Sequence, residues 1–494
     1  MLMRLPSKSQ VAWAAIPVAF VLVVLLFFPF RYRIEFDTDE GINAIKAMMV
    51  LRGYRLYGEI WSDQPPLFTF LLTVWFRAFG LRLTAARLMV LLFSAGQIAL
   101  GTSYLRKNWG ILTAVCGGLM LVLLPYYLRL SVSIMIGLPA IALAVASFYM
   151  LAEWHSRPVL GRLVASGLLL GLSILTKGFT AVLVPIWLIG ILANVLRSPT
   201  LIRQGRHRWL GPAAWLTALG LVVGLGLLLI VRTEYLSQLL SVHLIASQSD
   251  EFAIDPEHRT LASYLSESWP IFALAAVGAG WAVKRRNWSA LYLAGWIVAG
   301  YAFLVINQPT WYHHQLLLTV PAALLAAIAV GASIDDVRFL RPDWPRARRW
   351  ALGLGSLGVF LVFLVIRLPG TAEGLDPRLP NLSGPGTDEE DERSLLAAIN
   401  DHASQTQWFY TDRPIFAFLA DIPVPPNLAV ISQKRLFTGG LTEQEIAATL
   451  DTYAPEMVLN SRFGLSAVAE YMRTRNFTRI DETIKYRLYF RRPP

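Results

Sequence analysis

The chain has 494 residues, which is long enough for two or three soluble domains. Its composition excludes that organisation, because 55% of the residues are hydrophobic and only 16% are charged, against about 25% charged in soluble globular chains. A single cysteine, Cys116, excludes a disulfide framework, a cysteine zinc site and an iron–sulfur cluster. The formal net charge of +11 could indicate a nucleic-acid partner, so the positions of the basic residues along the chain must be considered first.

Apolar segments long enough to cross a bilayer recur along the first three quarters of the chain. A bilayer core needs about 20 mainly apolar residues per helix. The first run resembles a signal peptide, but no small-residue cleavage site precedes Arg31, so we interpret it as a retained span. The sequence predicts a polytopic α-helical membrane protein with about 11 crossings, in the runs 11–30, 84–103, 110–125, 136–152, 163–177, 179–196, 210–231, 269–283, 289–306, 315–333 and 350–367.

The basic residues fall mainly in alternate loops between these runs. With a cytoplasmic N-terminus, the inside loops hold 18 Lys and Arg against 4 Asp and Glu. These loops are residues 1–10, 104–109, 153–162, 197–208, 284–288 and 335–349. The positive-inside rule therefore accounts for the whole basic excess, and we expect no nucleic-acid partner. We expect a multi-pass protein of the cytoplasmic (inner) membrane, with a cytoplasmic N-terminus and residues 368–494 outside.

One apolar segment, residues 64–80, does not fit the alternation of loops. Its apolar part is only about 15 residues long. If it crossed the membrane, every later loop would change sides. We therefore expect an interfacial helix in the first outer loop, with a genuine crossing as the alternative.

The chain changes character after Arg367. We divide it into a transmembrane domain at 1–367, a linker at 368–392 that is rich in Pro, Gly and acidic residues, and a small extracytoplasmic α/β domain at 393–494. Short apolar runs predict strands at 408–410, 457–459 and 486–490, and helical patterns predict helices at 443–453 and 465–474.

The first predicted outer loop carries four carboxylates within six residues: Glu35, Asp37, Asp39 and Glu40. Side chains here can cap the helix that follows, and acids in its first turn complement the helix dipole. The functional alternative is a general base that takes a proton from an acceptor, or a ligand for a divalent cation. The spacing leaves metal dependence open.

The same outer loop continues with aromatic and polar residues that suit an interface and a sugar. Tyr57, Asp63 and Gln64 are the candidate substrate contacts in this stretch. The alternative for the aromatic residues is a belt at the membrane surface.

Lys177 lies at the outer end of a predicted span, where the positive-inside rule makes a lysine least expected. A buried ammonium needs a partner, and a phosphate suits it. The alternative is a lysine that snorkels to the interface. His243, Tyr312, His313 and His314 also lie in outer loops, as substrate contacts or as packed side chains; adjacent histidines do not share a helix face, which disfavours a metal site at that pair.

Several short motifs together resemble the GT-C superfamily of integral-membrane glycosyltransferases, in the branch of the protein O-mannosyltransferases and the lipid A aminoarabinose transferases. Their order and approximate spacing run from residue 11 to about 330. The motifs are Asp39-Glu40 after the first span, Asp-Gln-Pro-Pro at 63–66, Ala-Ala-Arg-Leu at 85–88 and Thr-Lys-Gly-Phe at 176–179.

The resemblance implies an enzyme that transfers a hexosyl or pentosyl group, with inversion, from a polyprenyl-phosphate donor at the outer face of the membrane. It makes Asp39 the catalytic or acceptor-orienting carboxylate, with Glu40 beside it, and it places Lys177 near the donor phosphate. Arg87 is a second candidate for that phosphate. His243 and residues 312–314 have looser counterparts in the family. The expected partners are the lipid-linked donor, membrane lipids and a glycan, lipid or protein acceptor.

Two departures from the family pattern leave the acceptor open. Aminoarabinose transferases carry Lys-Pro where this chain has Gln64-Pro65, and related enzymes carry an acid in the outer loop that corresponds to residues 130–137, which has none here. Two other functions remain as alternatives: a lipid-linked sugar flippase or other transporter, and a non-catalytic assembly protein. A transporter typically has polar residues at mid-span and an internal repeat, and the sequence shows neither.

Overall fold

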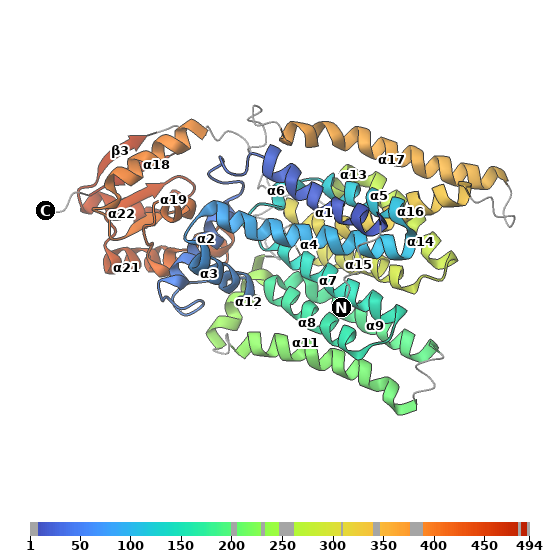
Figure 1. Cartoon of the computed structure of the whole chain (residues 1–494). Helices are drawn as coiled ribbons and strands as arrows, with labels where there is room; N and C mark the ends of the chain where they lie inside the picture. Colours follow the sequence, from blue (N-terminus) through green and yellow to red (C-terminus); the bar gives the residue numbers. More distant parts are fainter. Residues whose placement is uncertain are drawn as a thin grey trace, which may run out of the picture.

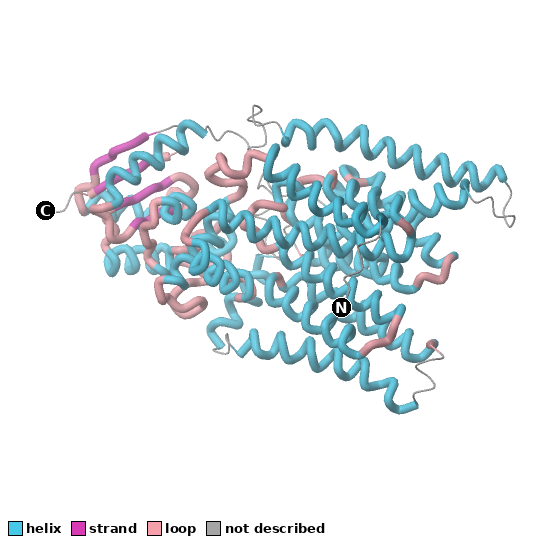
Figure 2. Tube along the Cα trace, viewed as in Figure 1, coloured by secondary structure: helices cyan, strands magenta, loops and turns pink. Residues whose placement is uncertain are grey.

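The structure is a computed structural model that describes residues 8–198, 205–228, 233–246, 261–307, 310–338, 346–375, 389–482 and 486–491. Long helices form a bundle, and a small sheet flanked by short helices lies at one end of it (Figures 1 and 2). We call the described residues from 389 onward the C-terminal unit, and the end of the bundle next to it the sheet-side end. The predicted fold class, a polytopic α-helical membrane protein with a small C-terminal α/β part, is confirmed.

Seven described helical segments are long and apolar enough to cross a membrane, and five further apolar helices are shorter. Each of the eleven predicted runs coincides with one of these helices, and the twelfth is α3. The bundle and the first loop contain α1 (Lys8–Phe27), α2 (Thr38–Leu51), α3 (Leu67–Phe79), α4 (Leu83–Trp109), α5 (Ile111–Val122), α6 (Tyr127–Leu130), α7 (Gly137–Ser156), α8 (Leu160–Thr176), η1 (Gly178–Val182), α9 (Leu183–Arg197), η2 (Gly205–Trp209), α11 (Leu210–Leu228), α12 (Thr233–Ala246), α13 (Leu261–Glu267), α14 (Trp269–Lys284), α15 (Trp288–Ile306), η4 (Tyr312–Gln315), α16 (Leu316–Arg338) and α17 (Arg346–Leu375).

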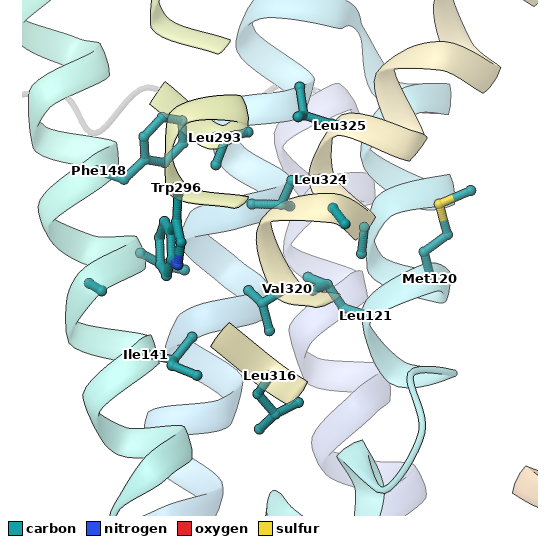
Figure 3. Close-up of a cluster of buried hydrophobic side chains, with 14 of the residues drawn as sticks. Met120, Leu121, Ile141, Phe148, Leu293, Trp296, Leu316, Val320, Leu324 and Leu325 are labelled. Carbon is teal, nitrogen blue, oxygen red and sulfur yellow. The ribbon is translucent and has the colours of Figure 1, made fainter. Parts of the chain in front are cut away.

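Helix α16 is the central helix of the bundle, because 94% of its apolar window is buried inside the protein. Figure 3 shows Val320 and Leu324 of this helix among side chains from its neighbours, with Leu121 of α5 on one side and Phe148 of α7 and Trp296 of α15 on the other. The packed core fixes the position of α16. It therefore also fixes η4, the short turn that immediately precedes α16 at the sheet-side end.

Helices α2 and α3 lie in the loop between α1 and α4 at the sheet-side end (Figure 1). Helix α3 has 13 residues, which at about 1.5 Å per residue is too short for a bilayer core of about 30 Å. It buries Phe68, Leu72 and Phe76, spaced by four residues on one face, and the Phe76 ring lies 5.2 Å from that of Phe418 in the C-terminal unit. This packing favours the interfacial interpretation of residues 64–80.

The C-terminal unit contains a four-stranded sheet with the strand order β1-β2-β4-β3, in which β1 and β2 are parallel and the other pairs are antiparallel. The three predicted strands and both predicted helices are present, and β3 was not predicted. The elements are α18 (Glu389–Ala403), β1 (Phe409–Thr411), α19 (Pro414–Leu419), η6 (Pro426–Leu428), α20 (Gln433–Phe437), α21 (Glu443–Tyr453), β2 (Met457–Asn460), α22 (Ser466–Thr474), β3 (Thr478–Glu482) and β4 (Arg487–Phe490).

Helices extend into both ends of the predicted linker, residues 368–392. Helix α17 continues past Pro369 to Leu375, and α18 begins at Glu389. A proline removes one backbone donor, and apolar membrane helices tolerate this loss. The remainder of the predicted linker, residues 376–388, lies outside the described residues.

The C-terminal unit shares a hydrophobic core with the first loop of the bundle. One cluster of buried side chains joins Met48 of α2 and Phe68 of α3 to Phe416 of α19 and Met457 of β2. The opposite face of the sheet packs on α21 and α22 through a separate cluster that includes Val458. Residues from the two ends of the chain therefore meet at the sheet-side end of the bundle, where the predicted site residues also lie.

Candidate active site

Glu40 and Arg87 form an ion pair in the interior, with side-chain exposures of 0% and 1%. Arg87 donates to the Glu40 carboxylate at 2.8 and 3.2 Å and to the carbonyls of Phe30 and Arg33 at 2.6 and 2.7 Å. Glu40 also accepts from the backbone N–H of Ile134 at 2.9 Å. The expected roles of Glu40 in catalysis and of Arg87 in phosphate binding do not fit this geometry, because both charges are neutralised and buried. The pair instead holds the start of α2 against α4.

Asp37 caps the N-terminus of α2, as the sequence allowed. Its carboxylate accepts from the backbone N–H of Asp39 at 2.9 Å and from the hydroxyl of Tyr312 at 2.7 Å, and Arg129 lies 3.8 Å away. Tyr312 belongs to η4, so this hydrogen bond ties the first loop to the turn that the central helix positions. Asp37 therefore acts as a helix cap and, through the same hydrogen bond, fixes the backbone of Asp39.

Asp39 lies in the first turn of α2 with a partly buried carboxylate. Burial and, after it, the negative charge of Asp37 raise the pKa of Asp39 to about 7, against the opposing positive charge of Lys177. Lys177 follows α8 and is itself 8% exposed. Among the described residues, no side-chain hydrogen bond or ion pair joins either group to a partner. The site thus combines a carboxyl group that titrates near neutral pH with a nearby buried cation.

Asp63 is surrounded by basic groups from three distant segments. Its Oδ2 lies 3.7 Å from Nε2 of His243 in α12 and 3.6 Å from Nζ of Lys434 in α20, and Nζ of Lys434 lies 2.5 Å from Nδ1 of His243. Lys46 of α2 contacts Ser62 at 3.5 Å. These cations hold the pKa of Asp63 below its usual value, despite its burial.

Tyr57 and Gln64 shape the loop that carries Asp63. Tyr57 is buried in a left-handed conformation with φ of 68°, and its hydroxyl donates to the carbonyl of Gln64 at 2.6 Å. Gln64 also supports the charged form of Asp63 by hydrogen bonding. Tyr57 therefore stabilises the conformation of the loop. Gln64 is less buried than Tyr57, so of the two it is the more accessible to a substrate.

His313 and His314 lie beside the charged cluster rather than in it. Nδ1 of His314 accepts from the backbone N–H of Trp311 at 3.3 Å and caps η4. Its ring lies 6.3 Å from that of Phe179, over which Lys177 sits at 5.0 Å. His313 stacks edge-on against His314 at 4.5 Å. The two histidines thus pack against Phe179, the aromatic ring that Lys177 contacts.

Six of the predicted site residues lie together in the structure: Asp37, Asp39, Asp63, Lys177, His243 and Tyr312. Three cations in the same place were not predicted: Lys46, Arg129 and Lys434. The cluster therefore holds four Lys and Arg side chains against three carboxylates. A surplus of positive charge in a partly buried site favours an anionic ligand. Within the described part of the chain, no group of three or more His, Cys, Asp and Glu residues forms a metal-binding set.

Ion pairs also fasten the C-terminal unit next to this cluster. Arg413 pairs with Glu35 of the first loop at 2.6 Å and with Glu392 of α18 at 3.1 Å, and Arg52 pairs with Asp421 at 2.8 Å. Burial raises the pKa of Glu35 to about 7, although Arg413 opposes the shift. Glu35 therefore has an anchoring position and lies outside the group around Asp39.

No protein-family model and no curated protein sequence matches the chain. Solved structures do match it over almost its whole length. ArnT from Cupriavidus metallidurans bound to undecaprenyl phosphate matches with a TM-score of 0.63 and 17% identity, over 97% of each chain. The chain has the fold of the GT-C glycosyltransferases.

A second group of similar structures comes from Archaeoglobus fulgidus. Its oligosaccharyltransferase AglB, in complex with an inhibitory peptide and a dolichol-phosphate, matches with a TM-score of 0.56 and 12% identity, over 92% of this chain and 70% of AglB. The apo form of the same enzyme gives a TM-score of 0.57. At these identities the likeness shows the fold, and the fold predicted from the sequence motifs is confirmed.

Proposed function

We propose that this protein is a glycosyltransferase that moves a sugar from a polyprenyl-phosphate donor to an acceptor. The observation that carries the proposal is the partly buried Asp39 carboxylate, poised near neutral pH, close to the buried ammonium of Lys177. A base and a phosphate-binding cation are what this transfer requires. The bound undecaprenyl phosphate and dolichol-phosphate of ArnT and AglB, which have this fold, support a lipid-phosphate donor here.

The proposed step is a single in-line displacement with inversion. A hydroxyl or amine of the acceptor attacks the anomeric carbon of the donor sugar and forms the new glycosidic bond. The bond between that carbon and the phosphate oxygen breaks, and the polyprenyl phosphate leaves with the electron pair. Asp39 takes the acceptor proton, while Lys177 neutralises the charge that develops on the leaving phosphate.

The sides of the membrane follow from the charge pattern of the loops. We place the N-terminus in the cytoplasm, and the charged cluster and the C-terminal unit on the outer face of the inner membrane. The transmembrane domain, residues 1–367, carries the chemistry, and the extracytoplasmic unit helps to form the site. The sugar is a hexosyl or pentosyl group, and the acceptor is a glycan, a lipid or a protein.

The test is release of polyprenyl phosphate by the purified protein from a polyprenyl-phosphate sugar, in the presence of envelope acceptors. Asp39→Asn keeps the shape of the side chain and removes the base, so we expect transfer to fall by roughly 10²–10⁴. Binding of the donor should remain. Asp451→Asn, on the exposed face of α21, is the matched control and should transfer at the wild-type rate.

The same assay separates the transferase from a flippase. A flippase moves the intact lipid-linked sugar and releases no polyprenyl phosphate. Full activity of the Asp39→Asn variant would remove Asp39 from the mechanism, and translocation without release would replace the proposed function.

A further inference from the structure

Helix α20 presents one lysine of the C-terminal unit to the charged cluster on a fixed backbone. Ser432 caps the helix by accepting from the backbone N–H of Arg435 at 3.2 Å. Arg435 is buried, donates to the carbonyl of Asn427 at 2.6 Å and lies over the Trp61 ring at 4.8 Å. The preceding side chain, Lys434, therefore extends from a rigid backbone toward Asp63 of the first loop.

The same junction is closed by apolar contacts. Ile42 of α2, Trp61 of the first loop, Val242 of α12 and Val430 of the C-terminal unit form one small buried cluster. Each belongs to a segment that also contributes to the charged group around Asp63. The position of the C-terminal unit at this point is thus fixed by packing as well as by charge.

With respect to the described residues, the Lys434 ammonium has unused capacity to donate hydrogen bonds. Its polar contacts among the described residues are Nδ1 of His243 at 2.5 Å and Oδ2 of Asp63 at 3.6 Å, and the second of these exceeds a normal hydrogen bond. An ammonium has three protons to donate. Lys434 is partly exposed, whereas Lys46 and Lys177 are buried. Of these three lysines, Lys434 is the one that solvent or a ligand reaches most readily.

Lys434 also belongs electrostatically to the group around Asp39. It interacts with Asp39 and with Lys177, although 257 residues separate Lys434 from Lys177 in the sequence. Asp39 and Asp63 interact with both ammonium groups and offset part of the repulsion between the two like charges. A phosphate group would neutralise both and would accept hydrogen bonds from both ammonium groups.

We propose that Lys434 is a phosphate ligand of the donor site, so that the C-terminal unit supplies part of the binding site for the donor. The proposal rests on the proposed function and names one more residue that contacts its substrate. Lys434 lies against His243 and Asp63, and in the complex with donor its remaining N–H groups donate to the lipid phosphate beside Lys177. Burial lowers the pKa of Lys434, so the ammonium gains from an anionic partner.

The test measures binding of undecaprenyl phosphate to the detergent-purified full chain, with no acceptor present. Lys434→Met should weaken this affinity roughly ten- to a hundredfold, which is the loss expected for a charge-assisted hydrogen bond. Lys434→Arg keeps the charge and should retain most of the affinity. Uncharged undecaprenol should bind equally to all variants. Arg462→Gln, an exposed residue of the same unit, is the matched control.

A purely structural role for Lys434 makes a different prediction at Asp63. If Lys434 serves only to hold the C-terminal unit to Asp63 through their ion pair, Asp63→Asn should weaken phosphate binding as much as Lys434→Met does. That result would overturn the proposal. If Lys434 binds phosphate, Asp63→Asn removes a competing carboxylate and should leave affinity unchanged or increase it. Unchanged affinity in a folded Lys434→Met variant would also overturn it.

The outcome for Lys434 is separable from the outcome for transfer. Wild-type protein that binds undecaprenyl phosphate through Lys434 but releases none from a donor would contradict the proposed function and leave the phosphate site in place. Protein that transfers sugar normally, but whose Lys434→Met variant binds undecaprenyl phosphate with wild-type affinity, would contradict only the role of Lys434.

Discussion

Replacing Arg87 by methionine tests whether the Glu40–Arg87 pair holds the structure or binds substrate. Both side chains are at most 1% exposed, and the guanidinium satisfies Glu40 and two backbone carbonyls. Breaking a buried pair by removing one partner costs about 3–5 kcal/mol, because the remaining charge is left without compensation. We expect Arg87→Met to lower the apparent unfolding temperature in detergent by several degrees. Arg82→Met, an exposed change at the same end of α4, should have little effect.

The double variant Arg87→Met with Glu40→Gln sharpens this test. Removing both charges eliminates the uncompensated carboxylate, so the double variant should be more stable than Arg87→Met alone. Affinity for undecaprenyl phosphate, measured on the folded fraction, should stay near the wild-type value in both. Our reasoning is refuted if Arg87→Met is as stable as Arg82→Met and yet binds the lipid phosphate at least tenfold more weakly.

Three further predictions follow from the geometry of α2. Since the pKa of Asp39 is about 7 and the deprotonated form is the base, kcat/KM should rise with pH through about 7, and this rise should disappear in Asp39→Asn. Tyr312→Phe removes the hydrogen bond to Asp37. We expect it to lower the free energy of unfolding by about 1–3 kcal/mol, which a lower unfolding temperature would show. A Cβ at Gly41 would lie 2.6 Å from a backbone nitrogen of α19, so Gly41→Ala should speed proteolytic release of the C-terminal unit, whereas Gly96→Ala, with open space around it, should not.

The membrane helices and most of the C-terminal elements could be predicted because their signals are local. Helix α21 is bounded by a capping box between Thr442 and Glu445 and by Ala454 in the left-handed conformation. Strand β3 was missed because it carries charged residues, among them Arg479 and Asp481, and pairs on one side only, with β4. Charged side chains are typical of edge strands, which makes their sequences hard to distinguish from loops.

The site residues differ in how much local signal they carry. Lys46 follows Asp39 by seven residues on the same helix, a spacing that places both on one face, so the sequence contained the information to find it. Lys434 had no such signal. It reaches Asp63 only because the C-terminal unit packs on α2 and α3, and that packing depends on contacts between residues more than three hundred positions apart.

Asp39 and Glu40 show why the acidic pair alone could not assign its own roles. Adjacent residues of an α-helix point about 100° apart, so the two carboxylates must face different surroundings. Glu40 faces Arg87 and the backbone of Ile134, where its charge is fully compensated. Asp39 faces the cluster that contains Lys177, where no described side chain is bonded to it. A carboxylate that is already neutralised in the interior contributes stability, whereas one held without a partner can take a proton from a substrate. The rotation of α2, set by the Asp37 cap and the Glu40–Arg87 pair, therefore decides which of the two acids is available for chemistry.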